Sequence, residues 1–401
     1  MREAIEVVSV VLPFRVNNYV VEELIDWDCA PEDPIFRLTF PHREMLAPHD
    51  YQRVARLLHE GAPNAELRAA AQEIQRRLNP HPAGQLQLNV PQVDGVRHRG
   101  IQHKYRETVL FFPAQAQTCH AYCTYCFRWP QFVGLEDLKF ASREVDPIVR
   151  YVEAHPDVTS VLLTGGDPLM MRTTLLRRYV EPLMALPQLG SIRLGSKALA
   201  YWPARFFEDP DADDLLRLFE EVTAAGKDLA FMAHCSHPRE LETPSAKRAI
   251  SRILATGATI RCQAPLIRTV NDQSEVWAEM WRAQVRLGAV PYYMFIERDT
   301  GPRSAFEVPL GEAYRIFREA FTQVSGLART VRGPSMSATP GKVVLDGVPK
   351  ISGKKVFALR FLQARNPDWV GRPFFARFDP EATWFSELRP AFTGDALYFE
   401  P

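Results

Sequence analysis

A regular alternation of short apolar segments and longer helix-like segments begins at Val158, and it restricts the possible fold more than any other feature. The apolar segments have the length of strands, and the segments between them have the length of helices. The expected strands are Val158–Leu163, Ser191–Leu194, Leu229–Ala233, Thr259–Ala264 and Pro291–Ile296, and the expected helices are Thr174–Ala185, Asp213–Ala225, Pro244–Ala255 and Glu275–Leu287. Repeated strand–helix units predict parallel strands joined by right-handed helical crossovers.

A first strand at Thr108–Phe112 and a helix at Asp146–His155 extend this pattern toward the N-terminus. The total of about six strand–helix units is too small for a closed eight-stranded barrel. The sequence therefore predicts an α/β fold, an open partial (β/α)6 barrel spanning residues 96–345. In such folds the chemistry lies at the C-terminal ends of the strands.

The regions on either side of the barrel have a different character. Residues 1–95 contain helix-like segments at Tyr19–Asp26, His49–Gly61 and Ala65–Leu78, which predict a helical N-terminal region packed on the barrel. Residues 346–401 form a C-terminal extension rich in proline and aromatic residues. We expect this extension to cover the barrel or to dock on a second subunit, and we expect a homo-oligomer.

The charge balance and the short apolar runs exclude two classes of partner. Lys plus Arg and Asp plus Glu both total 48, so the formal net charge is zero, and nucleic-acid binding usually requires a basic excess. The apolar runs are strand-sized, far short of the roughly 20 residues of a membrane-spanning helix. Ile5–Phe14 is interrupted by polar residues, and no small-residue cleavage site follows it. We expect a soluble, cytoplasmic protein.

Three of the six cysteines lie within eight residues, at Cys119, Cys123 and Cys126. In a cytoplasmic chain such clustering indicates a metal or redox centre more often than disulfides. Three thiolates at this spacing can bind one face of a 4Fe–4S cluster and leave the fourth iron open to a further ligand. A zinc site with His120 as fourth ligand is the alternative, although structural zinc sites usually take paired ligands from two separate places.

The C-x3-C-x2-C spacing, with the aromatic Tyr125 before the last cysteine, resembles the signature of the radical S-adenosylmethionine superfamily. A second motif follows the expected strand Val158–Leu163, where Thr164 is followed by Gly165, Gly166 and Asp167. Glycines after a parallel strand let the backbone approach a ligand closely. The resemblance implies that this turn holds the methionyl amine of S-adenosylmethionine.

A closer resemblance, from about Pro13 to about Asp346, is to the lysine 2,3-aminomutase family. The segments that carry it are Phe14–Asn17, His103–Tyr105, Arg128, Leu162–Asp167, Ala233–Pro238, Gln263, Val270–Asp272 and Pro291–Tyr293. The resemblance implies an isomerase that uses the cluster, S-adenosylmethionine and pyridoxal 5'-phosphate to move an amino group from the α to the β carbon. It also implies an external electron donor of the flavodoxin or ferredoxin type.

The same resemblance assigns roles to individual cofactor-binding residues. Lys342, which follows Arg332-Gly333-Pro334, corresponds to the catalytic lysine that forms the Schiff base, in a loop about three residues longer than usual. Lys350, Lys354 and Lys355 are the other candidates for this role. Lys104 and Tyr105 correspond to the pair that binds the cofactor phosphate, and Lys suits this task as a point charge. His234, His237 and Gln263 align with polar residues near the cofactors, or they serve as structural groups.

The substrate-binding positions differ from those of family members that act on lysine. Arg128 corresponds to the arginine that binds the substrate α-carboxylate. Arg298 and Arg332 stand where lysine-specific members have two aspartates, and two cations would repel an ammonium by several kcal/mol in a partly buried site. The resemblance therefore implies an acidic substrate, such as glutamate or aspartate. The alternatives are that Arg298 pairs with a neighbouring carboxylate, or that a slip of one residue brings Asp299 into the pocket.

Four other functions stay open at this point. The altered loop before Lys342 is compatible with a radical enzyme that acts without pyridoxal phosphate on another substrate, and a lysine 2,3-aminomutase is a further candidate. A non-catalytic iron–sulfur or zinc protein that senses or binds a partner is the alternative outside enzymology. Modification of a lysine on a partner protein fits less well, because the expected pocket charges oppose an ammonium.

Overall fold

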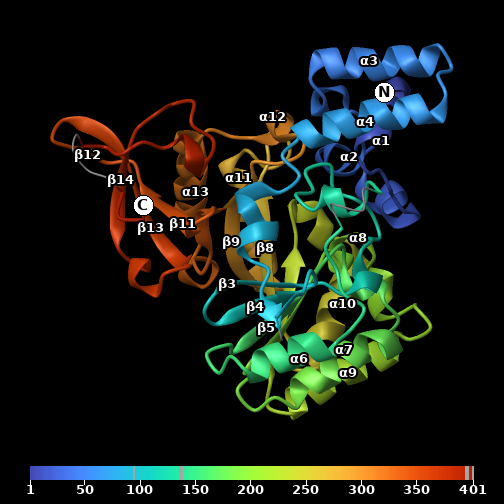
Figure 1. The fold of residues 1–401 in the computed structure, drawn as a ribbon, viewed down its shortest axis with the longest axis vertical. Helices are drawn as coiled ribbons and strands as arrows, with labels where there is room; N and C mark the ends of the chain where they lie inside the picture. Colours follow the sequence, from blue (N-terminus) through green and yellow to red (C-terminus); the bar gives the residue numbers. More distant parts are fainter. Residues whose placement is uncertain (94, 135–138, 393–396, 400–401) are drawn as a thin grey trace.

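The computed structural model describes residues 1–93, 95–134, 139–392 and 397–399, and its centre is a large mixed sheet (Figure 1). In the described residues this sheet has 12 strands in the order β12-β13-β11-β10-β9-β8-β7-β6-β5-β4-β3, with β14 paired to β13. Strands β4 to β10 run parallel to one another, while β3 at one edge and β11 to β14 at the other are antiparallel. This arrangement confirms the expected α/β class and the open barrel.

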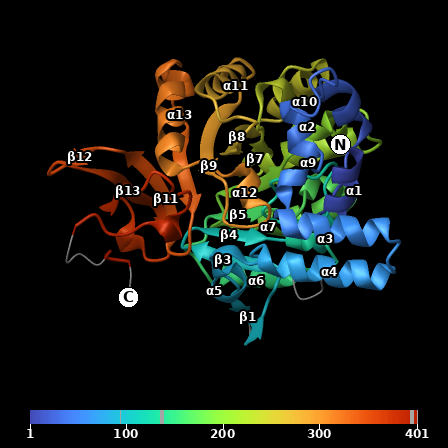
Figure 2. The same cartoon turned by 90° about the horizontal axis from the view of Figure 1, so that it is seen from above.

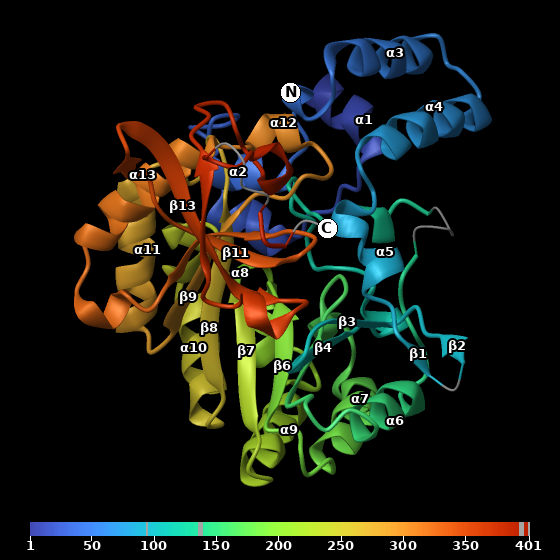
Figure 3. The same ribbon diagram turned by 60° about the vertical axis from the view of Figure 1, so that its left-hand side comes forward.

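The parallel strands and their connecting helices follow the alternation in the sequence. The strands are β4 (Thr108–Phe111), β5 (Ser160–Leu163), β6 (Ser191–Ser196), β7 (Asp228–His234), β8 (Thr259–Leu266), β9 (Val290–Ile296) and β10 (Arg332–Ser337). The helices are α6 (Asp146–Glu153), α7 (Thr173–Met184), α8 (Ala198–Tyr201), α9 (Ala212–Ala224), α10 (Pro244–Ala255), α11 (Ser274–Arg286), α12 (Arg303–Phe306) and α13 (Leu310–Thr322). Figure 3 shows β6 to β9 side by side.

Local sequence signals explain where the helices begin. Thr243 caps α10, because its hydroxyl accepts a hydrogen bond from the Ala246 N–H at 3.1 Å, and Pro244 stands at the first helical position, where an N–H has no partner in the helix. Along β6 the side chains of Ile192 and Leu194 are buried against the helices, whereas Arg193 faces the other way and is less buried. The strand alternation therefore sends selected side chains toward the barrel interior.

The N-terminal region is helical, as expected, and lies on the opposite side of the barrel from the C-terminal strands (Figures 1 and 2). Its helices are α1 (Arg2–Val11), α2 (Pro34–Thr39), α3 (Pro48–His59), α4 (Asn64–Arg77) and α5 (Gln85–Leu88), followed by β1 (Gln92–Val93) and β2 (Val96–Arg97), before β3 (Ile101–Tyr105) joins the main sheet. The hydrophobic core of this region also includes Ala121, Tyr125 and Trp129. The segment with the cysteines is therefore packed against the N-terminal helices.

The C-terminal extension continues the barrel sheet as antiparallel strands. They are β11 (Gly341–Gly347), β12 (Lys350–Ile351), β13 (Lys354–Ala364) and β14 (Pro373–Arg377), and β11 pairs with β10. The boundary expected between residues 345 and 346 falls inside β11, so the antiparallel part of the sheet already begins at Gly341. Aromatic residues of β14 and of the segment after it pack together, with Phe374 and Phe399 ring centres 4.9 Å apart. No helix among the described residues has both the length and the apolar character needed to cross a membrane.

Candidate active site

A cavity of about 240 Å³ lies at the C-terminal ends of the barrel strands, where the chemistry of such folds is expected. Its lining combines apolar side chains with several cations. The apolar side chains include Leu110, Leu162, Phe295 and Ile296, and the cations are Lys104, Arg128, Arg193, Arg298 and Lys342. The lining also includes Tyr105, His234, Gln263 and Glu297. Seven of the fifteen site residues expected from the sequence therefore line one cavity: Lys104, Tyr105, Arg128, His234, Gln263, Arg298 and Lys342.

The three cysteines lie on the loop after β4, where each is partly buried. Burial, followed by the charges of Asp167 and the neighbouring cysteines, raises the pKa of Cys119 well above its usual range. Burial raises the pKa of Cys126 to about 12, and Cys123 adds to the effect. Ligation by iron would have to displace these protons. Three sulfur donors from one loop are the donor set that a cluster with one open iron requires.

No three His, Cys, Asp or Glu side chains within the described ranges lie close enough to hold a single metal ion. This result concerns one ion, whereas a cubane places each cysteine on a different iron atom. His120, the expected fourth zinc ligand, has an imidazole Nδ1 without a hydrogen-bond partner in the described structure. Burial lowers the pKa of His120 to about 4.

The turn after β5 supports the cysteine loop through close backbone contact. The Gly166 N–H donates to Ala116 O at 2.9 Å, and the Asp167 N–H donates to Thr118 O at 2.8 Å. A Cβ on Gly166 would lie 2.3 Å from Thr118 O, and one on Gly165, whose φ is +150°, would lie 2.3 Å from Gln117 Nε2. Both glycines are therefore needed for packing directly before Cys119.

The Asp167 carboxylate is buried and fully engaged by the protein. One oxygen accepts the Leu169 N–H at 2.9 Å, and the other accepts the Ser196 hydroxyl at 2.8 Å and the Lys197 N–H at 2.9 Å. Burial raises the pKa of Asp167 to about 6 against these hydrogen bonds. Asp167 thus ties the turn after β5 to the end of β6, and its expected contact with the methionyl amine stays a prediction.

A buried ion pair organises the strand ends beside the cysteines. Lys197 Nζ lies 2.7 Å from a Glu240 carboxylate oxygen, and Glu240 also accepts the Ser236 N–H at 2.5 Å. The Tyr125 hydroxyl lies 3.0 Å from the Ser236 hydroxyl. This network connects the ends of β6 and β7 to the cysteine loop, which fixes the loop relative to the barrel.

Lys342 is one of two lysines among the described residues that line the cavity, and it is partly buried. Its ammonium nitrogen lies 4.2 Å from the centre of the Tyr293 ring and 5.5 Å from that of Phe295. Burial, with smaller contributions from Arg193 and Arg332, lowers the pKa of Lys342 to about 7. Lys350, Lys354 and Lys355 are exposed on the C-terminal strands and do not line this cavity. The fit of an aldehyde cofactor is therefore best at Lys342, whose amine is partly neutral near pH 7.

Lys104 and Tyr105 come from the end of β3 and line the same cavity. The Lys104 ammonium donates a hydrogen bond to Ala338 O, and burial, with the nearby Arg298, Arg365 and Lys342, lowers the pKa of Lys104 to about 6. The buried Tyr105 hydroxyl lies near Ser337 without the geometry of a hydrogen bond. Both groups can accommodate an anion such as a phosphate.

Arg128 lies between the cysteines and the rest of the cavity. Its guanidinium carbon is 4.4 Å from the centre of the Phe112 ring and 4.9 Å from that of Phe127. Burial, followed by the charge of Arg298, lowers the pKa of Arg128 to about 10, although Cys126 and Cys119 oppose this effect. No carboxylate of the described residues pairs with it. A buried arginine without an anion is suited to bind a carboxylate from a ligand.

Arg298 and Glu297 follow β9 directly, and both line the cavity. Arg298 Nε is buried without a hydrogen-bond partner in the described chain, and one terminal nitrogen reaches Ser337 O only at 3.5 Å. No described carboxylate lies within 4.0 Å of Arg298. In the described residues Arg298 therefore does not form an ion pair with a neighbouring carboxylate, which was the alternative considered from the sequence. Asp299 does not line the cavity. Burial raises the pKa of Glu297 well above its usual range, which favours the uncharged acid.

Arg332 lies apart from these residues. It is the first residue of β10, it is exposed, and its guanidinium carbon lies 4.4 Å from the centre of the Tyr292 ring. It does not line the cavity, although its charge contributes to the lowered pKa of Lys342. The structure therefore separates Arg332 from Arg298, and its role in substrate binding stays a prediction.

The two histidines have different surroundings. His234 lies at the end of β7 and lines the cavity, with its Nε2 2.9 Å from Gln263 Nε2. Burial, followed by the charges of Lys197 and Arg128, lowers the pKa of His234 to about 3. His237 lies outside the cavity, where its Nδ1 accepts the Arg239 N–H at 3.2 Å. His234 and Gln263 are thus placed for cofactor contact, whereas His237 caps a short turn.

Among the charged residues that line the cavity, Arg193 and Glu297 were not expected there from the sequence. The inward direction of Arg193 follows from the two-residue periodicity of β6, but periodicity alone does not show whether an interior arginine is paired.

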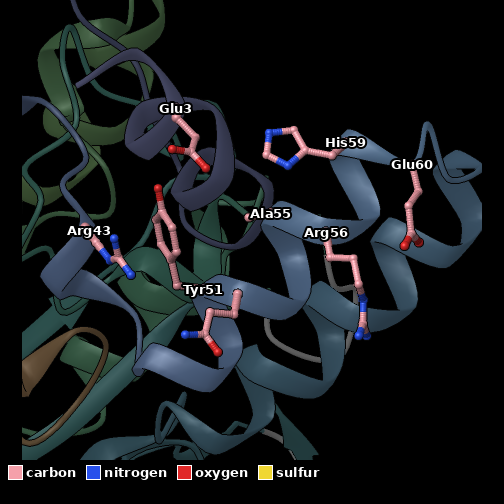
Figure 4. Close-up of a pocket in the computed structure, with 8 residues that line it drawn as sticks. Glu3, Arg43, Tyr51, Ala55, Arg56, His59 and Glu60 are labelled. Atoms are coloured by element: carbon pink, nitrogen blue, oxygen red, sulfur yellow. The ribbon is translucent and has the colours of Figure 1, made fainter.

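A separate hollow on the N-terminal helices contains none of the expected residues (Figure 4). There Tyr51 points toward Glu3, whereas Arg56 and Glu60 point away, so no charges converge on a ligand.

Comparison with known proteins gives relatives of one kind. No protein-family model matches the chain. A putative L-lysine 2,3-aminomutase from Aquifex aeolicus (strain VF5) is 32% identical over 387 residues, covering 96% of this chain and 90% of that protein. L-lysine 2,3-aminomutase from Escherichia coli (strain K12) is 28% identical, covering 62% and 68%. A solved radical SAM methyltransferase structure from Sphaerobacter thermophilus covers 73% of this chain and 94% of its own, at 17% identity and a TM-score of 0.39.

Proposed function

The chain belongs to the lysine 2,3-aminomutase family of radical S-adenosylmethionine enzymes, and on this basis we propose that it moves the α-amino group of glutamate or aspartate to the β carbon. The reaction class is that of an isomerase. The observation that carries the choice of an acidic substrate is the charge of the cavity. Five cationic side chains line the cavity, and Glu297 is the carboxylate among its described lining residues. The cations are Lys104, Arg128, Arg193, Arg298 and Lys342.

The cofactors of the proposed reaction are a 4Fe–4S cluster, S-adenosylmethionine and pyridoxal 5'-phosphate. When bound, they supply a radical that removes a β hydrogen and a carbonyl carbon through which the amino group migrates. Cys119, Cys123 and Cys126 would hold the cluster, and Lys342 would hold the pyridoxal aldehyde. Reduction of the cluster calls for an external electron donor, for which we propose a flavodoxin or ferredoxin.

Lys342 contributes a nucleophile near neutral pH. Its pKa of about 7 leaves a substantial fraction of the amine unprotonated, and an unprotonated amine is the form that attacks an aldehyde. The apolar surface of Tyr293 and Phe295 beside the nitrogen would limit the access of water to an aldehyde held by Lys342. Within the described chain the Lys342 ammonium contacts aromatic rings, whereas the Lys104 ammonium already donates a hydrogen bond to a backbone carbonyl.

Arg128 and Arg298 would bind the two carboxylates of the substrate. Arg128, closer to the cysteines, would orient the α-carboxylate so that the β carbon faces the cluster end of the cavity. Arg298 would bind the side-chain carboxylate, because its Nε has no partner within the described chain. An ammonium at this position would face a cation, and the uncharged form of Glu297 would not compensate for the repulsion.

The test is a product analysis with matched substrates. Anaerobically reconstituted protein is incubated with pyridoxal 5'-phosphate, S-adenosylmethionine, dithionite and either glutamate, aspartate or lysine, and β-amino products are separated by chromatography with mass detection. We expect a β-amino isomer from an acidic substrate and 5'-deoxyadenosine in every active sample. A β-amino product from lysine, with none from glutamate or aspartate, would contradict the acidic specificity. Turnover by a Lys342→Ala protein would contradict the proposed role of Lys342.

A further inference from the structure

Arg193 is a cation at the end of the cavity where Lys342 lies, and the assignments above give it no function. It stands on β6 and lines the cavity, while its strand neighbours Ile192 and Leu194 point outward into the hydrophobic core. Its charge acts on Lys342, whereas the charges that act on Arg128 are those of Arg298 and the cysteines. Arg193 is therefore a cation of the cavity to which no ligand has been assigned.

The Arg193 guanidinium has no ion pair and no hydrogen bond to any described residue. Burial lowers the pKa of Arg193 from its ordinary value. Arg193 is partly buried, and proteins usually compensate for such a charge with a carboxylate or a bound anion. The free protein thus contains an uncompensated positive charge at this point.

The groups around Arg193 increase this need for an anion. The charged neighbours that act on it are Arg261 and Arg332, and the polar neighbours are the hydroxyls of Tyr292 and Tyr293. Arg261 and Arg332 both stack on the Tyr292 ring, at 5.5 Å and 4.4 Å from its centre. None of these neighbours carries a carboxylate, so three arginines from β6, β8 and β10 share one electropositive region.

We propose that Arg193 forms an oxyanion subsite at the Lys342 end of the cavity, which binds either the phosphate of the pyridoxal cofactor or the side-chain carboxylate of the substrate. Both groups are compact oxyanions that a guanidinium binds through two parallel hydrogen bonds. The existence of the subsite depends only on Arg193 and its surroundings, whereas the identity of the two natural ligands rests on the proposed function.

The first experiment tests the subsite with simple anions. Titration calorimetry of the full-length protein without pyridoxal phosphate uses inorganic phosphate and glutarate as probes. We expect Arg193→Met to weaken binding of at least one probe about 10-fold or more, and Arg193→Lys to restore part of the loss. Arg286→Met, on the exposed face of α11, is the control and should bind as the unmodified protein does. Circular dichroism and the Tm verify that each variant is folded.

The second experiment distinguishes the two sources of the oxyanion. Binding of pyridoxal 5'-phosphate is compared with that of pyridoxal, and binding of glutamate with that of 2-aminobutyrate, which lacks the distal carboxylate. A loss in Arg193→Met for pyridoxal 5'-phosphate but not for pyridoxal assigns the cofactor phosphate, and a loss for glutamate but not for 2-aminobutyrate assigns the substrate.

Equal binding of both simple anions to Arg193→Met and to the unmodified protein, or no binding to either, would overturn the subsite. This result is independent of turnover, because the calorimetric titration needs neither the cluster nor S-adenosylmethionine. A protein that bound phosphate through Arg193 but formed no β-amino product would disprove the proposed function and leave the subsite standing.

Discussion

The hydroxyl oxygen of Tyr201 lies 3.9 Å from the sulfur of Cys123, within hydrogen-bonding range for sulfur. Tyr201 is fully buried, and Lys197 Nζ lies 4.3 Å from the centre of its ring. Asn17, from the N-terminal region, donates a hydrogen bond to the Tyr201 carbonyl at 2.9 Å. The position of this hydroxyl is thus fixed from both sides. Once Cys123 is a thiolate ligand, the Tyr201 hydroxyl is the hydrogen-bond donor.

We expect Tyr201→Phe to lower the reduction potential of the cluster. A hydrogen bond to a cluster sulfur stabilises the reduced, more negative state, and a long bond of about 0.5–1 kcal/mol corresponds to roughly 20–40 mV for one electron. Redox titration followed by electron paramagnetic resonance measures the shift. Tyr179→Phe, whose hydroxyl donates to Gln115 away from the cysteines, is the matched control. An unchanged potential in Tyr201→Phe would exclude the hydrogen bond.

Reaction of the protein with pyridoxal 5'-phosphate should titrate with the amine of Lys342. Because the pKa of Lys342 is lowered to about 7, formation of the lysine-bound pyridoxal absorbance band should increase from pH 6 to pH 8 and then level off. An unperturbed lysine would still gain reactivity up to about pH 10. Lys342→Met should lose the band at every pH, and a persistent band in that variant would shift the role to Lys350, Lys354 or Lys355.

Removal of the Lys342 amine should also stabilise the fold in a pH-dependent way. Between pH 7 and 10.5 the unfolded chain binds more protons at this lysine than the folded chain does, so its contribution to folding becomes more favourable as the pH rises. Lys342→Met should therefore gain most stability at or below pH 7, by no more than about 5 kcal/mol, and little near pH 10.5. Urea unfolding at pH 7 and pH 10 measures the difference. A gain that was the same at both values would contradict the lowered pKa.

Gly166→Ala should destabilise the cysteine loop. Its Cβ would lie 2.3 Å from the carbonyl oxygen of Thr118, a backbone atom that cannot move without shifting Cys119. We expect a loss of about 1–3 kcal/mol in the free energy of unfolding and a lower iron content after reconstitution. Gly190→Ala is the control, because its Cβ would meet Thr159 O at an ordinary 3.8 Å. Equal stability of the two variants would contradict the packing argument.

Arg298 and Arg332 should differ in their effect on turnover of an acidic substrate. Arg298→Gln removes a cation from the cavity, and loss of a charged hydrogen bond of about 1.5–3 kcal/mol corresponds to roughly a 10- to 150-fold decrease in kcat/KM. Arg332→Gln changes an exposed residue outside the cavity, and we expect less than about a 3-fold change there. Kinetics with glutamate and aspartate measure both. A larger effect at Arg332 than at Arg298 would reverse the assignment.

The fold could be predicted from the sequence wherever apolar residues recur in a regular pattern along the chain. The strand–helix alternation after Val158 placed β5 to β9 and their helices within a few residues, because each strand is a short apolar run bounded by helical segments. The C-terminal strands were missed. Segments such as Lys354–Ala364 mix charged and apolar residues on an antiparallel sheet, and the prolines nearby suggested irregular structure.

The candidate site could be predicted where a sequence motif identifies the chemistry of a residue. It could be predicted less well where the role of a residue depends only on its position in the folded chain. The cysteine spacing and Lys342 are recognisable in the sequence, and both lie at the cavity or beside it. The sequence placed Arg298 and Arg332 together, yet one lines the cavity and the other is exposed. Arg193 was missed because an arginine in a strand carries no sign of whether it has a partner until its neighbours are known.

Lys342 stands on β11, the first antiparallel strand beyond the barrel, whereas the cysteines follow β4 near the other edge of the same sheet. The strands β5 to β10 between them therefore set the distance between the cysteine loop and Lys342. A substitution that flattened these strands, even on their helix-covered side, would move the residues that would hold the cluster away from the lysine that would hold the pyridoxal aldehyde, although each of those residues would be unchanged. Catalytic failure could thus originate in the hydrophobic layer behind the barrel.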